Sequence, residues 1–311
     1  MIWRRLVTVV FVAITAGGFL FAPCALGGED RGDTSPAASA LGAGSNWILR
    51  LPQAERVIYR GVVSFDDAGT GTMALMYPAP SAGGMLAAVL THGLLVGAAK
   101  DDQKTKLQTA ADNVLVPYKA VLDNFNFRDL MRRALRKTAN GANGKLIETP
   151  NDAGSEMLVE SLPVFLLTQD QKAIILDNVV SITVRGNTLA AIHPIRVVST
   201  AQSETDIAAF WMRNDGEKLK DESAQLVALS LDIAFRNAVS ETDNVTPPYR
   251  TIRYQEGGAE KIERAQVLSN DCNRLVIRTL RGTLMSVPAS SATTTTSVGG
   301  TCKATAVLGS Q

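Results

Sequence analysis

The stretch that decides the fold runs from Met157 to Thr200 and reads MLVESLPVFLLTQDQKAIILDNVVSITVRGNTLAAIHPIRVVST. Val, Ile and Leu recur throughout it, and turn residues such as Arg185-Gly186-Asn187 interrupt it. Apolar runs of this length between turn signals are typical of β-strands, which we expect at 157–167, 173–184 and 192–200. The middle of the chain is therefore predicted to build a sheet.

Further strands are expected on both sides of this stretch. On the N-terminal side, β-rich runs with turn residues between them predict strands at 57–59, 62–65, 73–77 and 145–148. On the C-terminal side, Gly257-Gly258 and Arg281-Gly282 are turn signals, and they separate predicted strands at 251–254, 261–268, 275–280 and 283–287.

Helical periodicity appears in three places. A helix is expected to begin near Ser81 and to end or kink at Pro117. A second covers 127–138 (FRDLMRRALRKT), and a third, with a broad apolar stripe, covers 217–240. The pattern predicts an α+β or mixed α/β fold: a mixed, mostly antiparallel sheet flanked by helices, with a C-terminal antiparallel β extension.

The N-terminus has the three parts of a secretory signal peptide. Arg4 and Arg5 precede an apolar run, which ends in small residues such as Ala25 and Gly27. We expect a signal peptide at 1–27, a flexible tether at 28–46, an α/β domain at 47–245 and a β-rich extension at 246–311. The predicted location is the periplasm. The alternatives are an uncleaved membrane anchor and lipidation at Cys24, which Pro23 fits badly.

Cys272 and Cys302 are the two cysteines that remain after the predicted signal peptide. An oxidising compartment favours a disulfide between them. The bond would close a loop of roughly 30 residues, worth about 3 kcal/mol in the chain-entropy model. The alternative is two free buried thiols.

Residues 82–99 carry no charge, and Thr91 and His92 are their clearly polar side chains. Small residues recur four apart at Gly84 and Ala88, and again at Gly93 and Gly97, where another backbone could approach closely. Three interpretations stay open: a core helix against the sheet, a protein–protein or membrane-inserted surface, or a site around His92.

Catalytic and metal-binding patterns are absent from the sequence. His92 and His193 are the two histidines, and neither belongs to a metal-ligand or nucleophile motif, so we expect no cofactor and no metal. The formal net charge of +1, spread along the chain, does not favour nucleic-acid binding.

The densest basic patch is the helix at 127–138, where Arg128, Arg132 and Arg136 share one face that could contact phosphate headgroups or an acidic partner. The alternative is a solvated face whose cations favour the helix dipole.

The order of elements, with FRDLMRRALRKT followed by the short strand GKLIETP, several strands and the helix ESAQLVALSLDIAFRNAV, resembles the periplasmic α/β domain of bacterial envelope lipoproteins and curli-secretion-like proteins. The resemblance covers the layout of residues 55 to 240. It implies scaffolding and partner binding without catalytic residues. The missing lipid-attachment motif and the cysteine-containing C-terminal strands depart from that pattern.

Two functions follow as hypotheses. The first is an exported cell-envelope protein without enzymatic activity, which binds an envelope protein partner, a second copy of itself or a membrane surface. The second is a periplasmic hydrolase or small-ligand-binding protein whose site is assembled from scattered polar residues.

Overall fold

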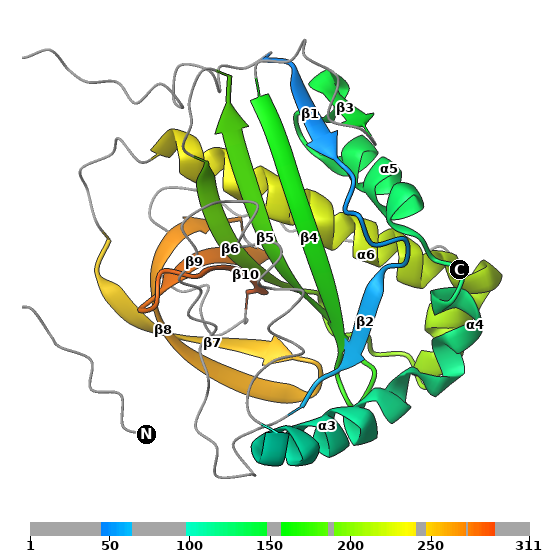
Figure 1. Ribbon diagram of the computed structural model, residues 1–311. Helices are drawn as coiled ribbons and strands as arrows, with labels where there is room; N and C mark the ends of the chain where they lie inside the picture. Colours follow the sequence, from blue (N-terminus) through cyan, green and yellow to red (C-terminus); the bar gives the residue numbers. More distant parts are fainter. Residues whose placement is uncertain are drawn as a thin grey trace, which may run out of the picture. The chain divides into compact units, whose positions relative to one another are not determined.

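The computed structural model describes residues 45–63, 98–147, 157–185, 190–240, 247–271 and 273–289. Figure 1 shows their arrangement. In chain order the elements are β1 (Trp47–Arg50), β2 (Ile58–Gly61), α3 (Ala98–Asp112), η2 (Asn113–Tyr118), α4 (Lys119–Leu122), α5 (Phe127–Lys137), η3 (Gly141–Asn143), β3 (Gly144–Ile147), β4 (Met157–Leu167), β5 (Ile174–Val184), β6 (Ala191–Val198), α6 (Ile207–Ser240), β7 (Tyr249–Glu256), β8 (Ala259–Asn270), β9 (Arg274–Thr279) and β10 (Leu284–Pro288).

All the described strands belong to one ten-stranded sheet with the order β3-β1-β4-β5-β6-β10-β9-β8-β7, and β2 also pairs with β4. The long strands β4, β5 and β6 form an antiparallel meander. β1 pairs in parallel with both β3 and β4, and β10 pairs in parallel with β6. From β10 to β7 every pairing is antiparallel. The predicted fold class, a mixed and mostly antiparallel sheet with helices and a C-terminal antiparallel run, is confirmed.

The first hydrophobic core lies between the sheet and the helices α5 and α6. Alternate residues of β4, such as Val159 and Phe165, are fully buried because successive side chains of a strand point to opposite faces. α6 covers β5 and β6, and α5 lies beside α6 (Figure 1). Leu226 and Leu231 of α6 belong to the same core.

The bounds of α5 and the end of α3 follow from local chemistry. The side chain of Asn126 accepts a hydrogen bond from the Asp129 N–H and caps the N-terminus of α5. Lys137 ends that helix, within one residue of the predicted end. Pro117 lies inside η2, so helix α3 has already ended at Asp112, because a proline cannot supply the N–H that an α-helix needs.

α6 starts earlier than the sequence predicts. Residues 207–212 form a short helix, Arg213 to Gly216 leave the helical conformation, and the predicted helix begins at Glu217. β1 was also not expected, because its four residues are too few to show an alternating pattern beside the predicted tether.

A second core lies on the opposite face of the sheet. In β5, Ile174 belongs to the first core and its neighbour Ile175 to the second, together with Ile252 and Ile277 from the C-terminal strands. The β7–β8 hairpin therefore packs its inner face against β5 and β6. The hairpin tip is held by Asp170 in the β4–β5 turn, which accepts a 2.6 Å hydrogen bond from the Gly258 N–H.

Several predicted features lie outside the described residues. They are the signal peptide, Cys24, most of the tether, the strand at 73–77, the small residues Gly84, Ala88, Gly93 and Gly97, His92, and both Cys272 and Cys302. The disulfide and the interpretations of residues 82–99 stay predictions. Within the ranges given above, no helix combines the length and the apolar character that a membrane crossing requires.

Candidate binding surface

Helix α5 divides its basic residues between two environments. Leu130, Met131 and Ala134 are buried against the sheet and α6, which fixes the rotation of the helix about its axis. Because residues four apart lie on the same side of a helix, this rotation directs Arg133 and Lys137 towards α6. Arg128, Arg132 and Arg136 are exposed.

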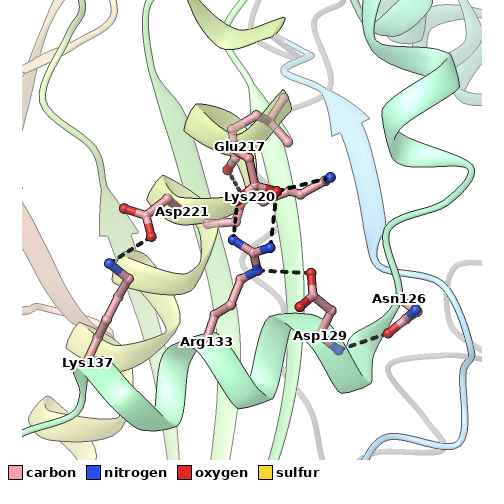
Figure 2. A network of polar contacts seen from close by, with 9 residues as sticks. Asn126, Asp129, Arg133, Lys137, Glu217, Lys220 and Asp221 are labelled. Atoms are coloured by element: carbon pink, nitrogen blue, oxygen red, sulfur yellow. Dashed lines mark hydrogen bonds and ion pairs between the residues drawn. The ribbon is translucent and has the colours of Figure 1, made fainter. Parts of the chain in front are cut away.

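The side facing α6 is a network of ion pairs (Figure 2). The Arg133 guanidinium donates to both carboxylate oxygens of Glu217, at 2.7 and 3.1 Å, and its Nε donates to Asp129 at 2.9 Å. Lys137 Nζ lies 2.9 Å from Asp221 Oδ1. The hydrogen bonds from Arg133 lower the pKa of Glu217 below its ordinary value, against a smaller opposing effect of burial. This bidentate geometry joins α5 to the start of the long part of α6.

The exposed side carries what we call the arginine row: Arg128, Arg132 and Arg136. They follow one another at four-residue intervals and span about 12 Å along the helix axis. Among the described residues, neither Arg132 nor Arg136 forms an ion pair. The predicted common face is therefore exposed to solvent, and Arg133 and Lys137 of the same helix are paired with carboxylates.

His193 has a structural environment. It lies on β6 with 5% of its surface exposed, under the C-terminal half of α6. Asn237 of α6 lies 3.3 Å from its Nδ1 and accepts a 2.7 Å hydrogen bond from Arg278 Nη2. This chain of side chains connects β6, α6 and β9 inside the fold.

The second core includes the polar cluster that best matches the idea of a site assembled from scattered residues. On β6, Arg196 donates to both oxygens of Asp177, at 2.6 and 2.7 Å. Burial raises the pKa of Tyr254 to about 12, with a smaller contribution from Glu256. Burial also raises the pKa of Glu256, against the opposing charges of Lys261 and Arg196. Asp177 and Arg196 satisfy each other, so this pair joins the neighbouring strands β5 and β6 and offers no free nucleophile.

No group of three His, Cys, Asp or Glu side chains lies close enough to hold a metal ion in the part of the chain that the structure describes. A protein-family model, a curated protein and a solved structure were each sought for this chain, and none matches. The resemblance to periplasmic envelope domains therefore stays a prediction.

One feature was missed at the level of sequence. Arg250 on β7 and Arg264 on β8 are both exposed, and the strand register places them at adjacent positions of neighbouring strands, with their side chains on opposite faces of the hairpin. Their separation of fourteen positions along the chain conceals this proximity, although the alternation in YRTIRYQE and the Gly257-Gly258 turn were available as signals.

Proposed function

We propose that the protein is an exported, non-enzymatic component of the cell envelope that binds an anionic membrane surface through the arginine row of α5. The observation that carries this proposal is the contrast within one helix. Arg133 and Lys137 are paired with carboxylates of α6, whereas Arg132 and Arg136 project to solvent without a carboxylate among the described residues.

The chemistry of guanidinium groups supports phosphate as the target. Arginine matches the geometry of phosphate oxygens and stays charged at any physiological pH. Three arginines near a membrane surface contribute about 3 kcal/mol, which corresponds to roughly a hundredfold in partitioning. That magnitude fits reversible, peripheral binding. The predicted signal peptide would bring the chain to the compartment between two phospholipid surfaces.

The test is co-sedimentation of the chain from residue 28 onwards with vesicles of phosphatidylglycerol and phosphatidylethanolamine, and with neutral phosphatidylcholine vesicles. The expected result is binding to the anionic vesicles alone, weakened at 0.5 M salt because screening shortens the range of the attraction. The variant R128Q/R132Q/R136Q should lose about a hundredfold in partitioning.

The matched control is R250Q/R264Q/R281Q, which removes the same charge from three exposed arginines of the C-terminal strands and turns. It should bind anionic vesicles nearly as well as the unaltered chain. Equal losses in the two variants would show that total charge alone is responsible. Failure of the unaltered chain to bind anionic vesicles would refute the proposal.

A further inference from the structure

β7 is the last of the described strands in the sheet. Among the described strands it pairs with β8 alone, so its other side has no strand beside it in that part of the chain. The β7–β8 connection is a two-residue turn, Gly257-Gly258, between the closing pair Glu256 and Ala259. Gly257 has a φ of +62°, which is the conformation of the first central residue in a type II′ turn.

The turn determines which backbone groups of β7 face outward. A two-residue hairpin closes on a hydrogen-bonded pair, and antiparallel pairs then alternate between bonded and non-bonded. Ile252 and Tyr254 therefore direct their N–H and C=O groups to β8. Thr251 and Arg253 direct theirs away from it, to the open side of the strand.

The inner side chains hold this strand in place. Ile252 and Tyr254 are buried in the second core, and the hairpin tip is bound to Asp170 through the Gly258 N–H. The open edge is consequently preformed, and a partner strand would not have to supply the cost of ordering it.

The outer face of the hairpin combines positive charge with apolar area. Tyr249 is 40% exposed and Ile262 is 56% exposed. Arg253 pairs with Glu260 at 2.8 Å on this face, whereas the exposed Arg264 has no ion pair with a described residue. Arg250 has the parity of Ile252 and Tyr254, so its side chain lies on the opposite face of the hairpin. Arg264 lies opposite the small side chain of Thr251, so its guanidinium can extend across Thr251 towards a strand added beyond β7.

We propose that β7 accepts an extended acidic segment of a partner protein as an additional strand. Thr251 and Arg253 supply the backbone hydrogen bonds, and Arg264 binds a carboxylate on the outer face of the added strand. A lipid surface has no row of backbone groups to satisfy this edge. A second copy of β7 is disfavoured because it would bring two arginines and one carboxylate, Glu256, to this edge. The proposal concerns the opposite end of the strand order from α5, and it does not depend on the membrane binding proposed above.

The test measures the binding of three ten-residue peptides by fluorescence anisotropy, and the protection of the Thr251 and Arg253 amides by hydrogen exchange. The peptide of alternating threonine and glutamate should bind and slow exchange of both amides by about tenfold or more. The peptide of alternating threonine and lysine should not bind. The peptide of alternating proline and glutamate has the same charge but lacks half of the N–H groups, and it should bind at least about tenfold more weakly.

The variant Thr251→Pro removes one outward N–H and leaves the hydrogen bonds to β8 intact, and edge strands tolerate proline. It should abolish binding of the threonine–glutamate peptide, while Thr251→Ala, which keeps the N–H, should bind as before. R264Q should weaken binding by about tenfold. The exchange measurement on the unaltered chain stands by itself if Thr251→Pro does not fold. Equal binding of the proline peptide, or binding without protection of Thr251 and Arg253, would overturn the proposal.

Discussion

Three consecutive residues with left-handed backbone angles separate the two helical parts of α6. Asn214, Asp215 and Gly216 have φ values of 53°, 56° and 77°. A side chain at Gly216 would also meet Val121, because a Cβ placed there would lie 2.6 Å from the Val121 Cγ1. Gly216 is therefore required for its conformation and for the space it leaves to the helix α4.

Replacing Gly216 by alanine should destabilise the protein by about 3 kcal/mol, combining the cost of positive φ with that of overpacking. The matched control is Gly282→Ala. Gly282 has a φ of +80° but nothing within 4 Å of the Cβ position, so its replacement should cost about 1 kcal/mol. Urea unfolding measures both values. Equal costs at the two positions would show that the contact with Val121 does not matter.

At the scale of elements, the β7–β8 hairpin depends on the turn between β4 and β5. Asp170 accepts hydrogen bonds from Thr168 Oγ1 at 2.6 Å, the Lys172 N–H at 3.1 Å and the Gly258 N–H at 2.6 Å. Burial by itself would raise the pKa of Asp170, but these hydrogen bonds together outweigh it and lower the pKa below the ordinary value. The ionised carboxylate is thus the form that holds the hairpin tip.

The variant Asp170→Asn should be less stable than the unaltered chain by about 1 kcal/mol at pH 7, a modest value because the carboxylate is largely exposed. Since the folded pKa is depressed, the contribution of Asp170 is complete above its unfolded pKa of about 3.9 and is lost as pH falls through the lower folded value. The stability difference between the two proteins should therefore fade below about pH 4. Urea unfolding at pH 7 and pH 3 checks this, and an unchanged difference at pH 3 would contradict it.

At the scale of the molecule, the two cores share their strands. Ile174 and Ile175 of β5 point into opposite cores. β10 connects the C-terminal strands to the rest of the sheet, because it pairs in parallel with β6. Damage to one core consequently weakens the strands on which the other depends. Residues 47–245 and 246–311, predicted from the sequence as a domain and an extension, are expected to unfold together.

Ile277→Ala, in the second core, tests this with a signal from the first. Trp47 and Trp211 are the tryptophans outside the predicted signal peptide, and both are buried in the first core. The substitution should cost about 3 kcal/mol and shift the tryptophan fluorescence and far-UV circular dichroism transitions together. Leu280→Ala, at an exposed turn residue, should change stability by less than about 0.5 kcal/mol. Separate transitions in Ile277→Ala would show that the two cores unfold independently.

The sequence by itself determined the types of most elements and the composition of the arginine row. The strands at 157–167 and 173–184 and the helix at 127–138 show their periods locally, because side chains repeat every two residues in a strand and about every 3.6 in a helix. The same helical period places Arg128, Arg132 and Arg136 on one face without knowledge of the fold.

The tertiary structure alone decided which surfaces remain available. It made β10 a parallel neighbour of β6, left β7 at the end of the sheet, and turned Arg133 to Glu217 while Arg132 stayed exposed. The strand Trp47–Arg50 was equally invisible in the sequence. The physical reason is that these features depend on contacts between segments far apart in the chain, whose combined free energy selects one pairing, and no local pattern records that sum.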